Sequence, residues 1–225
     1  MRKLIRLFKK QAVKKEWTKE EILSIYKMNV PDDYTETERA LILLATKNEL
    51  MPVEDVASLE TDQFCMFNEE AITEAILDKN EKVEVYVLHS HPTKTELIQK
   101  TIAKLELTEY IDIILGFPSS GDIFHAKDLN AILMATKLVT CIRYFVIANE
   151  TIIEYNYGYV EEEATDKIYK IISKLDFNEE LNRGLIAGIL PTMYAIRGID
   201  IKDPTKLIDK INITLVNELF RKRRL

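Results

Sequence analysis

The chain has 225 residues, 47% of them hydrophobic, which is enough for one large domain or for one domain with an appendage. Seven basic residues lie within residues 1–15 and four within residues 221–224, so the part between them holds 20 basic and 37 acidic residues. Such an acidic body argues against nucleic-acid binding over the whole surface, because attraction to phosphate needs a basic face.

Cysteine usage and hydropathy indicate the compartment. The two cysteines lie far apart and offer no paired metal-binding motif, which is typical of a reducing compartment. No apolar run reaches the roughly 18 residues of a transmembrane helix. The basic N-terminus also lacks the apolar core of a signal peptide. We therefore predict a cytoplasmic protein without a transmembrane segment.

Residues 1–34 are predicted to form an N-terminal helical segment. Residues 2–15 alternate basic and apolar side chains at helical spacing, which fits a helix packed on the body or one lying at a membrane surface. Thr18 and Glu21 have the spacing of a capping box, and the helix they open should run to about Lys27. Pro31 then breaks it.

The middle of the chain alternates strand and helix patterns. Strands are predicted over 39–47, 53–59, 63–67, 83–89 and 111–115, and helices over 69–79, 94–107 and 124–138. Residues 143–148 and 151–157 form a predicted hairpin. The strand at 83–89 is apolar on both faces, which is typical of a central strand. These elements predict an α/β domain over residues 35–160, with a mixed β-sheet flanked by helices.

From Glu161 onward the pattern is helical. Candidate helices span 162–175, 178–196 and 204–222, and Pro191 is expected to kink or split the second of them. We therefore predict a helical C-terminal region over residues 161–225.

A metal-binding pattern follows the central strand. His89 and His91 are two of only three histidines, and residues i and i+2 of a strand point to the same face. Pro92 ends the strand there, so the imidazoles lie at its rim. Asp122, delivered from a loop, can supply a third ligand. Three protein ligands of this kind with an open fourth position predict a catalytic Zn²⁺ site.

Such a centre could hydrolyse an amide bond if two further groups are present. Zinc lowers the pKa of the water it binds to near 7. A general base must accept the proton of that water, and a donor must stabilise the developing oxyanion. A glutamate suits the first role and a serine hydroxyl the second. His125, one helical turn beyond Asp122, could be a spare ligand or a surface residue.

Three motifs in order resemble the signature of the JAMM (MPN-type, JAB domain) zinc metalloprotease superfamily. They are a glutamate that opens an apolar strand (Glu38-Arg-Ala-Leu-Ile-Leu-Leu-Ala), then His89-Ser-His-Pro, then Ser119-Ser-Gly-Asp. The segment from Thr46 through Ala75 also resembles the RadC-like branch. The resemblance covers about residues 36–158 and implies an MPN/JAB-like (cytidine-deaminase-like) mixed sheet.

The resemblance also implies roles for individual residues. His89, His91 and Asp122 would bind zinc, and Glu38 would be the base. Ser119 would stabilise the oxyanion, since it stands three residues before the aspartate. Glu36 lies two residues from Glu38 on the same strand face, so it stays an alternative base.

One departure from the family concerns the spacing. Residues 92–118, 27 in all, separate His91 from Ser119, and the family has a much shorter gap. Residues 93–115 would then be an insertion beside the metal. It could act as a lid, contact the substrate, or keep Asp122 from reaching the histidines.

Members of this superfamily hydrolyse isopeptide or peptide bonds to ubiquitin or ubiquitin-like modifiers. The resemblance therefore implies a zinc isopeptidase whose partner is such a modifier or its conjugate. One alternative is a RadC-like DNA-associated protein, favoured by the two basic ends. Another is a non-catalytic MPN-type scaffold that pairs with a partner. The sequence names neither the modifier nor the oligomeric state, and an oligomer is compatible with it.

Overall fold

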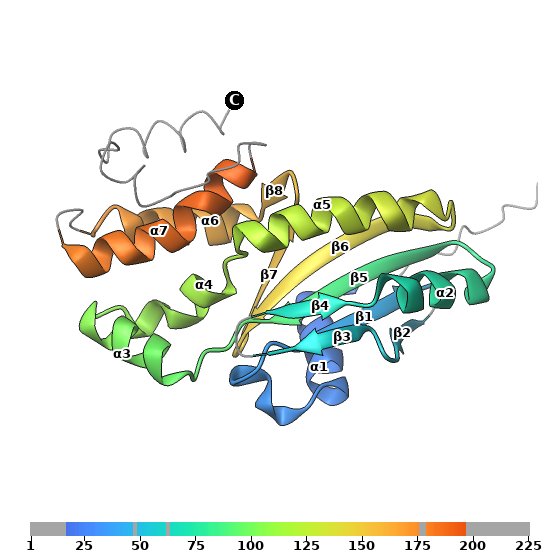
Figure 1. Cartoon of the computed structure of the whole chain (residues 1–225), viewed down its shortest axis with the longest axis horizontal. Coiled ribbons are helices and arrows are strands. Elements are labelled where there is room, and N and C mark those ends of the chain that lie inside the picture. The colour runs from blue at the N-terminus through green and yellow to red at the C-terminus, as the bar shows by residue number, and fades with distance from the viewer. Residues whose placement is uncertain (1–16, 47–48, 62–63, 176–178, 197–225) are drawn as a thin grey trace, which may run out of the picture.

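A six-stranded mixed sheet runs through the centre of the protein, in the order β2-β1-β5-β6-β7-β8, and β3 and β4 form a separate hairpin (Figure 1). The computed structural model describes residues 17–46, 49–61, 64–175 and 179–196. The strands are β1 (Ala40–Ala45), β2 (Leu50–Val53), β3 (Ala57–Glu60), β4 (Cys65–Phe67), β5 (Val83–Ser90), β6 (Val139–Ala148), β7 (Thr151–Asn156) and β8 (Tyr159–Val160).

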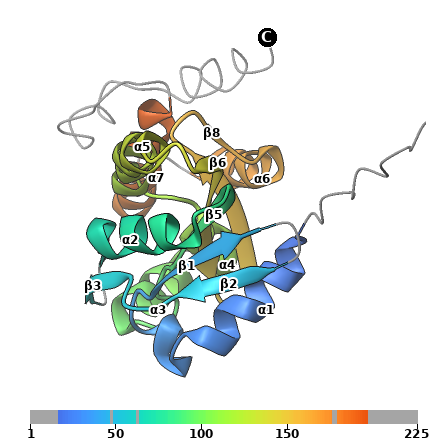
Figure 2. The ribbon, with the colours of Figure 1, turned by 90° about the vertical axis from the view of Figure 1, so that its right-hand side faces the viewer.

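Helices cover both faces of the sheet. They are α1 (Lys19–Asn29), α2 (Glu69–Lys79), α3 (Glu96–Lys104), α4 (Ile111–Gly116), α5 (Ser120–Ala135), α6 (Glu162–Ile172) and α7 (Glu180–Ala195), with 3₁₀ turns η1 (Asp32–Thr35) and η2 (Thr108–Tyr110). Figure 2 shows α1 on one side of β1 and β2, and α2 and α5 on the other. The predicted mixed α/β sheet flanked by helices is therefore confirmed.

The central strand β5 is buried on both faces because its side chains alternate between two hydrophobic clusters. Val85 and Val87 join the larger cluster, which also contains residues of α2, α5, α6 and α7. Tyr86 and Leu88 join the smaller one, against α1. Burial of both faces explains why the run 85–88 is apolar at every position.

The connection between β5 and β6 brings the site together. These strands pair in parallel, so the chain must cross over between them, and α3, α4 and α5 lie in that crossover. A crossover helix runs antiparallel to its strands, so the N-terminus of α5 lies at the carboxyl end of β5. The number of residues between β5 and α5 does not change where the N-terminus of α5 lies.

Two predicted strands are wrong. The strand at 53–59 is interrupted, because β2 ends at Val53 and the chain turns through Asp55, whose φ is 54°. Aspartate tolerates this left-handed conformation. The apolar run at 111–115 is helix α4, which follows a 3₁₀ turn. Five apolar residues cannot by themselves distinguish a buried strand from a buried helix.

The other predicted elements differ mainly at their ends. The capping box at Thr18 is present, α2 has the predicted bounds, and the hairpin of β6 and β7 forms. Helix α5 starts at Ser120, four residues before the predicted start. Helix α7 passes through Pro191 without ending. The segments at 2–15 and 204–222 lie outside the described residues. Within the described part, no helix has the length and apolar character needed to span a membrane.

Candidate metal centre

His89, His91 and Asp122 converge at the carboxyl end of β5. Their nearest ligand atoms all lie within 4.8 Å of one another, the one such group of three found among the described residues. The two Nε2 atoms are 3.2 Å apart. Asp122 Oδ1 lies 3.2 Å from His89 Nε2, and Asp122 Oδ2 lies 3.3 Å from His91 Nε2. The 27 residues between His91 and Ser119 therefore do not keep Asp122 from the histidines.

These distances fit a zinc ion. Ligand atoms about 2.0 to 2.1 Å from a tetrahedral Zn²⁺ are separated from each other by about 3.3 Å. The three measured separations are close to that value. Two neutral imidazole nitrogens and a carboxylate are also a ligand set that zinc accepts. The residues present therefore form a site able to bind a metal, and they fit the zinc ion that the motif predicts.

The Ser-x-x-Asp spacing has a local structural cause. Ser119 is the N-cap of α5, and its hydroxyl oxygen accepts a hydrogen bond from the Asp122 amide at 3.2 Å. In return, Asp122 Oδ2 accepts from the Ser119 amide at 2.6 Å. This reciprocal capping box fixes the carboxylate at the first turn of the helix, facing the histidines. The motif thus starts the helix and orients the ligand at the same time.

The two histidines differ in their surroundings. His91 Nδ1 lies 2.6 Å from the carbonyl oxygen of Leu115. A carbonyl only accepts, so Nδ1 carries the hydrogen, and Nε2 presents a lone pair when the ring is neutral. His89 is 3% exposed, and its Nδ1 has no hydrogen-bond partner within the described structure. Buried polar atoms are normally hydrogen-bonded, and exceptions to this are more typical of functional sites.

Glu38 lies beside the three ligands. The register pairs Ala40 with His89, and Glu38 lies two residues before Ala40, close enough for His89, His91 and Asp122 to act on its carboxyl group. The side chain is 9% exposed, and the Cys65 backbone of β4 hydrogen-bonds it. Burial raises the pKa of Glu38, although the two histidines oppose that shift. Glu36, the alternative base, is exposed at the end of η1.

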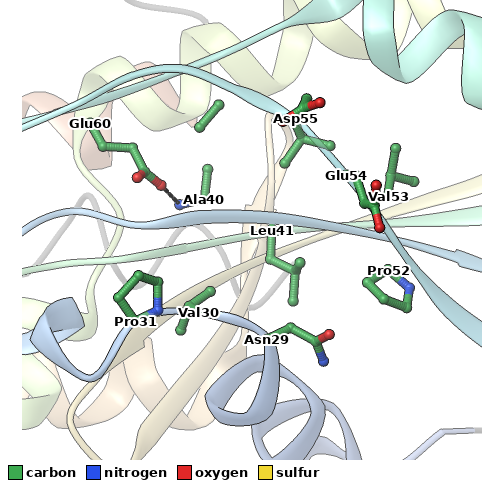
Figure 3. Close-up of a pocket in the computed structure, with 12 residues that line it drawn as sticks. Asn29, Val30, Pro31, Ala40, Leu41, Pro52, Val53, Glu54, Asp55 and Glu60 are labelled. Atoms are coloured by element: carbon green, nitrogen blue, oxygen red, sulfur yellow. Dashed lines mark hydrogen bonds between the residues drawn. The ribbon is translucent and has the colours of Figure 1, made fainter.

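The start of β1 is held by residues of β3. Glu60 accepts from the Ala40 amide at 2.9 Å and from Arg39 at 2.6 Å, and the Glu38 amide donates to Thr61 at 2.7 Å. Figure 3 shows Glu60 reaching Ala40 at one end of a pocket of about 540 Å³. None of the three ligands lines this pocket, so it is separate from the metal centre.

Electrostatics couple the three ligands. Burial alone would raise the pKa of Asp122, but the two histidines hold it well below its usual range. Burial would likewise lower the pKa of His91, yet the hydrogen bond to Asp122 raises it to about 9. Without a metal, a proton on His91 thus offsets the buried carboxylate. A metal that binds the three atoms must displace that proton.

The sequence did not indicate what the hairpin of β3 and β4 contributes. Besides holding Glu38, the hairpin carries Cys65, whose thiol pKa is raised by burial and by the nearby Glu38. Phe67 of the same hairpin stacks on His125 of α5, with ring centroids 5.4 Å apart. His125 is therefore half-buried, and it is not a member of the ligand group. The second cysteine, Cys141, is exposed.

Part of the chain is similar to part of a known enzyme. No protein-family profile matches the chain, and no solved structure matches it. Over 145 residues the chain is 28% identical to a 2,3-bisphosphoglycerate-independent phosphoglycerate mutase of Shewanella pealeana. That match takes in 57% of this chain and spans only 28% of the mutase. It is similarity to part of an enzyme and does not assign the chain to a family.

Proposed function

We propose that the protein is a zinc-dependent hydrolase of the MPN/JAB kind that cleaves an amide bond at the end of a ubiquitin-like modifier. One observation carries the proposal: three convergent ligand atoms lie beside a buried carboxyl group, Glu38, at the end of a central strand. Metal binding alone requires only His89, His91 and Asp122. The further step to amide hydrolysis depends on Glu38 and Ser119.

Each residue of the site has a separate task. Zinc held by the three ligands would activate a water molecule and polarise the substrate carbonyl. Glu38, buried beside the three ligands, accepts a proton from the attacking water and donates it to the leaving amine. Ser119 accepts its capping bond through the hydroxyl oxygen, so its hydroxyl hydrogen can be donated to the oxyanion.

A protein substrate is favoured by the surface of the hairpin. Leu59, Phe64 and Met66 are each about half exposed on or between β3 and β4, the hairpin that holds Glu38. Exposed apolar side chains gathered on one element are typical of a protein-binding surface. A small polar metabolite would gain little from them.

The proposal is tested by incubating the zinc-loaded protein with a panel of substrates. The panel contains isopeptide-linked and linear conjugates of ubiquitin-like and sulfur-carrier proteins. We expect cleavage after the last residue of at least one modifier, seen by mass spectrometry and blocked by a chelator. Failure to cleave any conjugate while holding stoichiometric zinc would contradict the proposal.

Two controls separate the alternatives. Phosphoglycerate is included because 145 residues of the chain are 28% identical to part of a phosphoglycerate mutase. Interconversion of phosphoglycerates without amide cleavage would replace our proposal with that activity. Salt-dependent binding of duplex DNA would instead favour the DNA-associated alternative, which depends on basic ends outside the described residues.

Ser119 allows its capping and catalytic roles to be separated. Ser119→Gly should keep most of the stability of α5, because glycine is a tolerated N-cap, whereas Ser119→Ala should cost about 0.5–2 kcal/mol. Both variants lose the hydroxyl hydrogen, so both should lower kcat by about 10²–10³-fold. Chemical denaturation and steady-state kinetics measure the two effects. If Ser119→Gly keeps full activity, Ser119 is a cap only.

A further inference from the structure

The insertion between His91 and Ser119 reaches the metal centre through Leu115. This residue lies in the last turn of α4, and its carbonyl oxygen accepts the Nδ1 hydrogen of His91 at 2.6 Å. Such a bond orients the ring and leaves Nε2 as the ligand atom, as an outer-shell partner of a metal-bound histidine does. His89 has no corresponding partner among the described residues.

The position of Leu115 depends on how closely α4 approaches the sheet. Gly116, the next residue, is buried against β6 and β7. A Cβ atom added there would lie 3.0 Å from Ile153 Cδ1 and 3.5 Å from Ala148 Cβ. The contact with Ile153 is tighter than nine in ten real Cβ contacts, so an alanine requires either the Ile153 side chain or α4 to move by a few tenths of an ångström.

Further bonds hold this end of the insertion in place. The Thr192 hydroxyl of α7 donates to the Pro118 carbonyl at 2.8 Å and is 1% exposed. Asn149, in the turn between β6 and β7, donates to Asp112 of α4 at 3.4 Å. The backbone of His91 is itself bonded to Ile147 of β6 at 2.8 Å. Both partners of the 2.6 Å bond are thus fixed to the same sheet.

We propose that the insertion is a structural part of the metal centre, in which Gly116 lets α4 pack so closely that Leu115 sets the orientation of His91. Gly116 and Leu115 are therefore positioning residues, and neither touches substrate. The inference rests on the proposed binding of metal by His91, but it does not depend on the reaction or the substrate. It also explains how the long insertion is compatible with an intact ligand group.

The test compares zinc affinity and the cobalt spectrum in four proteins. Gly116→Ala should weaken zinc binding about 10–100-fold and alter the visible absorption of the Co²⁺-loaded protein, because the outer-shell bond is disturbed. Gly184→Ala is the matched control, since a Cβ atom there meets nothing within 4 Å. Adding Ile153→Val to Gly116→Ala removes the Cδ1 atom that clashes, so affinity and spectrum should return toward the wild-type values.

Wild-type affinity and an unchanged cobalt spectrum in Gly116→Ala would overturn the inference. A second measurement covers the case in which that variant fails to fold. In the zinc-loaded wild-type protein, nitrogen-15 NMR should show His91 with hydrogen on Nδ1, and hydrogen on Nε2 would also overturn it. If the wild-type protein binds no zinc at all, the metal centre itself fails, which is a distinguishable result.

Discussion

Asp122→Asn should abolish tight zinc binding while leaving the fold intact. The substitution keeps an oxygen that can accept the capping bond from the Ser119 amide, but it removes the charge that faces both histidines. Loss of one ligand of three should weaken binding by more than about 100-fold, since outer-shell changes alone cost about 10–100-fold. His89→Ala should have an effect of similar size. Chelator competition measures both.

The matched control is Asp128→Asn, an exposed aspartate further along the same helix. It should bind zinc as the wild-type protein does. If Asp122→Asn retains wild-type affinity, the carboxylate is a helix cap rather than a ligand, and the proposed centre is wrong.

Glu38→Gln should abolish hydrolysis and keep the metal. A general base contributes about 10²–10⁴-fold to the rate, and glutamine cannot accept the proton. The ligand atoms are untouched, so zinc stoichiometry should stay at the wild-type level. Glu36→Gln is the matched control, since that exposed residue should contribute nothing to the rate. Loss of activity in Glu36→Gln but not in Glu38→Gln would exchange the two assignments.

The pKa of Glu38 also predicts a pH dependence. Burial raises it, so the folded state holds the Glu38 proton more tightly than the unfolded state does. The contribution of Glu38 to the unfolding free energy therefore falls as pH rises between the two pKa values. At neutral pH the metal-free Glu38→Gln variant should be at least as stable as the wild-type protein. In catalysis the base must be ionised, so the rate should fall as pH drops through the pKa that Glu38 has in the zinc-loaded protein.

The sequence predicted the ligand group because its motifs depend on local structure. Alternation in a strand puts His89 and His91 on one face, and a capping box turns Asp122 toward them. The crossover between parallel strands then brings both to one end of the sheet. None of these relations depends on the length of the insertion, which is why the ligands meet across 27 intervening residues.

The rest could not be read from the sequence because it depends on tertiary packing. Nothing in the run 111–115 showed that it forms a helix, or that the carbonyl oxygen of Leu115 meets His91. The bond from the Glu38 amide to the Thr61 carbonyl likewise joins two backbone atoms, whose pairing leaves no residue pattern. The bond from the Ala40 amide to the Glu60 carboxylate joins residues 20 positions apart, which local spacing does not reveal. The sequence placed Glu36 and Glu38 on one strand face, but β1 starts only at Ala40 and Glu36 ends η1, which leaves Glu36 exposed and Glu38 buried.

X-ray absorption spectroscopy of the zinc-loaded wild-type protein tests the central claim most directly. We expect about one zinc per chain, surrounded only by nitrogen and oxygen at about 2.0–2.1 Å, with the scattering pattern of two imidazoles. A protein that takes up no zinc would contradict it. So would a sulfur shell at about 2.3 Å, which would place the metal at a cysteine instead of at His89, His91 and Asp122.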